Sequence, residues 1–112
     1  MTIEYESYGT KYQIWFEITS YQNNDNIAVM AMCIDPEYNF PEPYGTLTVN
    51  ISKLEPPLAC IDTNNWRDAI ELIEKYDLGT DTGQRIQSGY CTYPVYELNL
   101  NNIKKYDGKE EN

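Results

Sequence analysis

The chain has 112 residues, of which 41% are hydrophobic, and 18 Asp and Glu residues outweigh eight Lys and Arg for a net charge of −10. This length predicts one domain and excludes an enzyme with separate cofactor and substrate lobes. The acidic balance disfavours direct binding of nucleic acid and favours a basic protein partner, although acidity that serves only solubility is the alternative.

The first half of the sequence predicts antiparallel strands. Residues 11–18 alternate in polarity and are rich in aromatic and β-branched side chains, which is typical of a half-buried strand. Asn and Asp at 23–26 then predict a hairpin turn. Three prolines in the segment 36–43 predict an extended or turning loop and exclude a central strand there. Further strands are expected at residues 27–35, 44–51 and 58–61.

The second half predicts one helix and one strand. Four consecutive N-cap residue types at 62–65 precede apolar residues spaced by three and four from Trp66 to Tyr76, which predicts a helix that Gly79 ends. We expect a polar loop over 79–89 and a last strand over 90–98, placed at a sheet edge by Pro94. The predicted fold is a single α+β domain over residues 1–98, with an antiparallel sheet of about five strands and one helix packed on a face, followed by a fraying polar C-terminal tail over 99–112.

The residue types argue against most catalytic chemistry. The sequence has no histidine, which removes the commonest general base and metal ligand, and it has no phosphate-binding glycine motif. Its three cysteines are widely spaced, which predicts buried reduced thiols and neither a disulfide framework nor a zinc site. We therefore expect no enzyme, no cofactor and no metal site. A small carboxylate enzyme or a magnesium site is the alternative that the carboxylate pairs leave open.

Those carboxylate pairs also permit a binding role. Carboxylates two residues apart on an extended strand lie about 6 to 7 Å apart on one face. Phosphates along a nucleic-acid strand are also several ångströms apart, so such carboxylates could occupy lysine and arginine sites that normally hold phosphates. Exposed tyrosines beside the proline segment could anchor the same interface. The predicted partner-binding residues are Glu4, Glu6, Asp35, Glu37, Glu42, Tyr38 and Tyr44, with Asp68, Glu71 and Glu74 of the helix as a second set.

Four segments resemble a small family of unknown function that is encoded on conjugative transposons, plasmids and phages of Gram-positive and gut bacteria. The segments are YGTLTVN at 44–50, CIDTNN at 60–65, TG at 82–83 and SGYCTYPVYE at 88–97. The resemblance covers about half of the chain and supplies no catalytic residues.

The resemblance implies a function, because relatives act as anti-CRISPR inhibitors of type II RNA-guided nucleases. We therefore expect a non-enzymatic anti-CRISPR protein that binds a basic, nucleic-acid-binding surface of a type II CRISPR effector nuclease and blocks guide assembly or DNA engagement. The alternative is an accessory or interaction protein of a mobile element with a different basic partner, such as a relaxase or a repressor. No apolar run is long enough to span a membrane, and the expected location is cytoplasmic.

Overall fold

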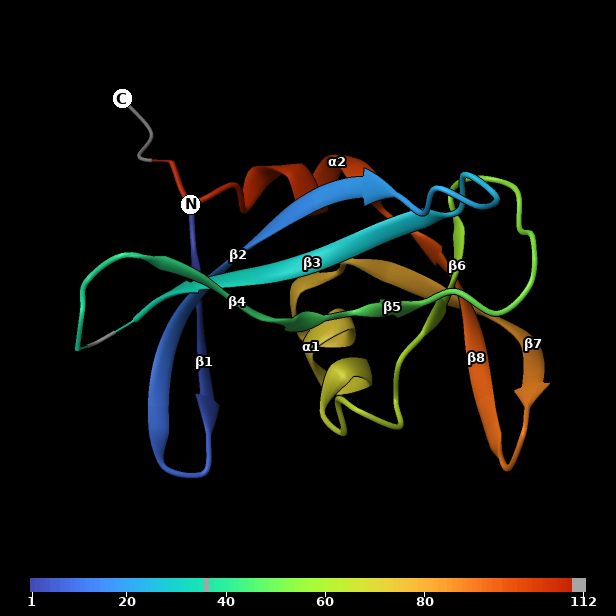
Figure 1. Cartoon of the computed structure of the whole chain (residues 1–112), viewed down its shortest axis with the longest axis horizontal. Helices are drawn as coiled ribbons and strands as arrows, with labels where there is room; N and C mark the ends of the chain where they lie inside the picture. Colours follow the sequence, from blue (N-terminus) through green and yellow to red (C-terminus); the bar gives the residue numbers. More distant parts are fainter. Residues whose placement is uncertain (36, 110–112) are drawn as a thin grey trace.

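The computed structural model describes residues 1–35 and 37–109, which form two antiparallel sheets and two short helices (Figure 1). The first sheet has the order β1-β2-β3-β4 and the second has the order β5-β6-β8-β7. The α+β class is confirmed, but the single sheet of about five strands is wrong. The strands are β1 (Ile3–Ser7), β2 (Thr10–Ser20), β3 (Ile27–Ile34), β4 (Pro41–Thr46), β5 (Thr48–Val49), β6 (Leu58–Ile61), β7 (Gly79–Ser88) and β8 (Cys91–Leu98), and the helices are α1 (Ala69–Tyr76) and α2 (Leu100–Lys105).

The first sheet follows from the alternation in its sequence. Ile14 and Phe16 of β2 and Val29 and Ala31 of β3 are buried on one face, as a period of two predicts for a sheet with one solvated face. The end of the proline segment begins β4 at Pro41, where a loop was predicted. β4 lies at an edge of the sheet, which confirms that the segment is not a central strand. Pro36 itself lies outside the described residues.

One predicted strand belongs to both sheets. Residues 44–46 finish β4, whereas Thr48 and Val49 form β5 of the second sheet. Leu47, at the crossing, is fully buried; its N–H donates to Val29 O and its carbonyl accepts from Asp62 N. The predicted strand over 44–51 therefore connects the two sheets.

The second sheet corrects two predictions. Residues 79–88 form the edge strand β7, not a loop, and β8 lies inside the sheet despite Pro94. The reason is a register shift between Asp81 and Arg85, which interrupts the β7 ladder directly beside Pro94, the partner of Arg85. Proline has no N–H to donate, so it is tolerated beside a bulge.

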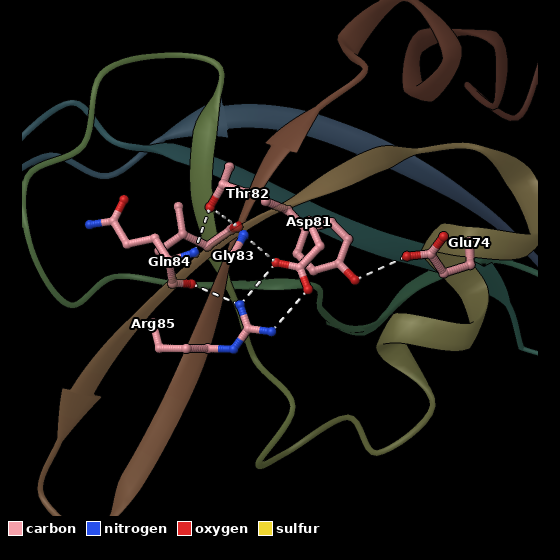
Figure 2. A network of polar contacts seen from close by, with 8 residues as sticks. Glu74, Asp81, Thr82, Gly83, Gln84 and Arg85 are labelled. Carbon is pink, nitrogen blue, oxygen red and sulfur yellow. Dashed lines mark hydrogen bonds and ion pairs between the residues drawn. The ribbon is translucent and has the colours of Figure 1, made fainter.

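Side chains stabilise this interruption (Figure 2). The Thr82 hydroxyl donates to Val95 O at 2.7 Å, and Gly83, at a φ of +84°, donates its N–H to Asp81 Oδ1 at 2.9 Å. Both terminal nitrogens of Arg85 donate to the Asp81 carboxylate at 2.9 Å, and this pairing lowers the pKa of Asp81 to about 2. The network satisfies its own polar groups, so we assign it a structural role.

Helix α1 is shorter than predicted. The Asp62 carboxylate accepts hydrogen bonds from Asn65 N and Nδ2, so the N-cap residue types at 62–65 form a turn ahead of the helix. The helix begins at Ala69 and ends at Tyr76, and the C-cap residue Asp77 adopts the left-handed conformation. Gly79 instead begins β7, where a Cβ atom would lie 3.0 Å from Glu97 O.

The C-terminal segment, predicted to be a fraying tail from Asn99, contains helix α2 and packs against the edge of the first sheet. β1 pairs with β2 only as far as Ile14, and beyond that point Phe16 N donates to Tyr106 O at 2.7 Å. Ile103 of α2 is fully buried, and Gly108 N donates to Met1 O at 3.0 Å. Residues 110–112 of the predicted tail lie outside the described residues.

The main hydrophobic core lies between the two sheets and receives both helices. Ile73 of α1, Ile103 of α2 and Leu98 of β8 are buried there with the inward residues of β2 and β3. In the described part of the chain, neither helix has the length or apolar character needed to cross a membrane.

The burial of Ile103 makes α2 part of the stable fold. Ile103→Ala should lower the free energy of unfolding by about 3 kcal/mol, since it removes a buried side chain and leaves a cavity. Lys104→Ala, on the exposed side of the same helix, should change it by less than about 0.5 kcal/mol. Urea unfolding followed by circular dichroism measures both, and equal stability of the two variants would contradict this role of α2.

Candidate functional site

The structure divides the seven predicted partner-binding residues among several places. Asp35, Glu37 and Tyr38 belong to the turn between β3 and β4. The Asp35 carboxylate accepts the N–H groups of Tyr38 and Glu37 at 3.0 and 2.7 Å, and these bonds hold its pKa below the usual range. Asp35 therefore shapes the turn, whereas Glu37 is exposed and the Tyr38 ring, 67% exposed, lies 6.1 Å from that of Phe40.

Two other predicted carboxylates have partners within the chain. Glu42 is half-buried, with Oε1 4.0 Å from the Cys33 sulfur. Burial, and then the charges of Glu42 and Asp35, raise the pKa of the Cys33 thiol. Glu4 is exposed and forms an ion pair with Lys11 at 3.5 Å. Neither carboxylate is as free for a partner as the sequence suggested.

The remaining two, Glu6 and Tyr44, lie on one open groove of about 920 Å³. Its walls are the end of the β1–β2 hairpin, β4, and the segment 62–68 that precedes α1. We call it the hairpin groove. Its lining includes Glu6, Tyr8, Tyr44, Trp66, Arg67 and Asp68.

Aromatic rings form one side of the hairpin groove. The Tyr44 ring stacks on Trp66, with centroids 5.2 Å apart and an interplanar angle of 23°. Tyr5 packs at 5.5 Å from Tyr44 and 5.7 Å from Trp66, and Tyr12 lies 5.1 Å from Tyr44. Each ring pair stabilises the cluster beyond its buried area. Tyr44, predicted to be an exposed anchor, is thus half-buried and rigidly held.

A bulge in β4 places Tyr44 in this cluster. β3 pairs Ala31 with Gly45 and Met32 with Pro43, which leaves Tyr44 as the extra residue of β4. Such bulges redirect a side chain and often lie beside functional sites. The bulge therefore explains how an edge strand contributes a ring to the groove.

The Tyr5 hydroxyl connects the aromatic rings to the acidic part of the groove. It accepts a hydrogen bond from Trp66 Nε1 at 2.9 Å and donates to Asp68 Oδ2 at 3.4 Å. Burial is the main reason that the pKa of Tyr5 is raised to about 12, so the hydroxyl stays protonated and donates at neutral pH. Asp68 is thus oriented at the groove by a buried donor.

The charges of the lining favour a positively charged ligand. Glu6, Asp62 and Asp68 supply three carboxylates, and Arg67 supplies one positive charge, which leaves a balance of −2. Carboxylates accept hydrogen bonds, and both carboxylates and ring faces attract cations. Among the described residues, no three His, Cys, Asp or Glu side chains gather closely enough to hold a metal ion.

Tyr8, at the groove rim, has a strained backbone. It adopts a φ of +50° in the hairpin turn with Gly9, and its side chain is 99% exposed. The left-handed conformation costs most residues about 1 to 2 kcal/mol and is usually left to Gly, Asn or Asp. No packing of the Tyr8 ring compensates for this cost, which suggests a role in binding.

Residues 15–112 match the family model described as a domain of unknown function, DUF4313. The chain belongs to this family. No curated protein and no solved structure matches it. The matched part contains Tyr44, Trp66 and Asp68, whereas Glu6 and Tyr8 precede it. The hairpin groove therefore joins the matched domain to the strand that lies before it.

Replacing Tyr8 should stabilise the protein. Tyr8→Asn should raise the free energy of unfolding by about 1 kcal/mol, because asparagine tolerates a positive φ and the exposed ring makes no packing contribution. Tyr90→Asn is the control, since Tyr90 is just as exposed at the β7–β8 turn but has a negative φ there, and it should change stability by less than about 0.5 kcal/mol. Denaturant unfolding checks both, and a destabilised Tyr8→Asn would disprove the strain.

The Tyr5 hydroxyl should give stability an alkaline dependence. Its pKa is raised from 10.0 to about 12 in the folded protein, so its contribution is complete below pH 10 and is lost as the pH rises toward 12. Tyr5→Phe should cost about 1 to 3 kcal/mol at neutral pH, because Trp66 Nε1 loses its buried acceptor.

The difference between wild type and Tyr5→Phe should therefore narrow as the pH rises from 10 to 12. Urea unfolding across this range measures it, with Tyr90→Phe as a control expected to follow the wild type. A difference that stays constant with pH would contradict the assignment.

Proposed function

We propose that this protein is a non-enzymatic binding protein whose partner is a basic, nucleic-acid-binding protein surface. In the specific form that the sequence resemblance suggests, it is an anti-CRISPR inhibitor of a type II RNA-guided nuclease. It acts by occupying a positively charged surface that would otherwise hold the guide RNA or the DNA.

The observation that carries the proposal is the large share of negative charge left uncompensated by the fold. In residues 1–35 and 37–109, lysine and arginine side chains form ion pairs with only two carboxylates, those of Glu4 and Asp81. Glu6 and Asp68 face the hairpin groove, and Glu37 projects from the β3–β4 turn. A surface of this kind attracts a positive partner over long range.

The type II effector is a suitable partner on physical grounds. It holds a heteroduplex in a strongly positive channel and reads its recognition sequence with arginines. An acidic protein can compete for either surface, and electrostatic steering would make its association fast at low salt. A different basic partner, encoded on a mobile element, would attract the acidic surface in the same way. The experiment below distinguishes this alternative from the nuclease.

A cleavage assay tests the proposal. Purified protein is added to a type II effector before or after guide loading, and cleavage of a target DNA is followed. We expect inhibition that saturates near one inhibitor per effector, because a binding protein acts stoichiometrically. Absence of inhibition in both orders of addition, across several effectors, would overturn the nuclease assignment. Complete inhibition at a small fraction of one equivalent would instead indicate catalysis.

Salt dependence tests the physical basis of the same complex. The dissociation constant should rise steeply between low and physiological ionic strength, because exposed charges are screened within about 8 Å at the latter. Glu37→Lys should slow association while leaving the free energy of unfolding within about 0.5 kcal/mol of wild type. Glu37→Gln is the matched control: it removes the charge without reversing it, so association should slow by an intermediate amount. An affinity independent of both salt and residue 37 would show that charge does not drive binding.

A further inference from the structure

We propose that the hairpin groove binds the cationic side chain of an arginine or lysine on an extended segment of the partner. This inference rests on the proposed function in taking the partner to be basic. It goes further in naming the part of the protein that makes the specific contact and the chemical group that it recognises.

Two carboxylates from different elements would bind the cationic group. Glu6 extends from β1, and Asp68 immediately precedes α1. Asp68 is held by the buried Tyr5 hydroxyl at 3.4 Å and is itself exposed, so one oxygen is oriented while the carboxylate stays accessible. Asp62 is already bonded to Asn65 through both of its oxygens, so it contributes charge and not a direct contact. Charge-assisted hydrogen bonds to carboxylates are among the strongest that a protein surface offers.

The aromatic rings add a second type of contact. A guanidinium or ammonium group is attracted to the face of a tyrosine or tryptophan within about 6 Å of the ring centroid. Tyr44 is half-buried and held by Trp66, Tyr5 and Tyr12, so this ring is fixed before any ligand arrives. Tyr8, kept exposed at the rim in a strained conformation, can cover the side chain that enters. A preformed site loses less conformational entropy on binding.

The size and charge of the groove restrict the ligand. At about 920 Å³ the groove is larger than one side chain and suits a short stretch of peptide. Its balance of −2 repels phosphate and carboxylate groups. Arg67 in the lining carries the positive charge that would repel a ligand made of many adjacent cations, which favours one cationic side chain with neutral neighbours.

Titration with short blocked peptides tests the inference. The probes are Gly-Arg-Gly, Gly-Lys-Gly, and Gly-citrulline-Gly, in which citrulline keeps the shape of arginine without the charge; a free diamine is the fourth probe. Binding is followed by NMR through the Trp66 Nε1–H and the backbone amides of residues 3–10 and 62–68. We expect saturable shifts with the arginine or lysine peptide and at least tenfold weaker binding of the citrulline peptide. Equal binding of citrulline, or tighter binding of the free diamine than of either cationic peptide, would overturn the inference.

Matched variants locate the site. Glu6→Gln with Asp68→Asn should weaken binding of the arginine peptide at least tenfold. Glu17→Gln with Glu55→Gln removes the same charge from exposed positions outside the groove and should weaken it less than threefold. Equal effects of the two pairs would overturn the inference, because binding would then follow net charge alone.

The outcome is distinguishable from that of the proposed function. If the arginine peptide binds with this specificity but no type II effector is inhibited, the groove assignment stands and the nuclease assignment fails. If the variant lacking Glu6 and Asp68 carboxylates inhibits an effector as well as wild type, the proposed function stands and the groove is not where the partner binds.

Discussion

Trp66 is the residue on which the arrangement of the first sheet and of the site depends. Tyr5 of β1 and Tyr44 of β4 come from the two opposite edges of that sheet, and both pack on the Trp66 ring. Trp66 is only 7% exposed. Its indole N–H donates to the hydroxyl of Tyr5, which lies 61 residues earlier in the sequence. The sheet is therefore curved so that its edges meet over one side chain of the segment that follows β6. A buried donor without this acceptor would cost free energy, which makes the curvature specific.

This constraint also produces the hairpin groove. Because the Trp66 indole N–H donates to the Tyr5 hydroxyl, their rings and the Tyr44 ring form a rigid wall, and the hydroxyl hydrogen of Tyr5 is directed at Asp68. The acidic groups that the fold leaves exposed then surround a preformed aromatic surface. Long-range attraction of a basic partner and local recognition of one cationic side chain are thus supplied by different parts of the same structure.

Local patterns in the sequence were sufficient to predict the strands in which buried side chains alternate with exposed ones or follow one another without a break. β2, β3 and β6 follow directly from Ile14, Val29 and Cys60 and their neighbours, because one face of each strand must be buried. β7 could not be found in this way, since nearly all of its side chains are exposed at a sheet edge and carry no alternation. Helix α2 is held in place by a few apolar residues, such as Ile103, that are buried in the core. The surrounding sequence is mostly polar, so it gives no sign of this burial.

The candidate site could be predicted from the sequence only in part, for a similar reason. Glu6, Tyr44 and Asp68 were predicted to bind a partner, but from strand spacing, loop exposure and helix position, and not from the groove that brings them together. Tyr5 and Trp66 show no local pattern that would connect them, because their contact depends on the curvature of the whole sheet. The positive φ of Tyr8 is a property of the turn with Gly9, and a Tyr-Gly pair there predicts a turn without predicting its strain.

The measurement that tests this account most directly is hydrogen–deuterium exchange of the protein alone and in complex with a type II effector or another basic partner. The account predicts protection on binding at the β1–β2 hairpin, residues 3–10, and at residues 62–68, with little change at the β7–β8 turn, which extends to the same side at the other end of the molecule (Figure 1). Protection confined to the β7–β8 turn, with unchanged exchange around the hairpin groove, would contradict it.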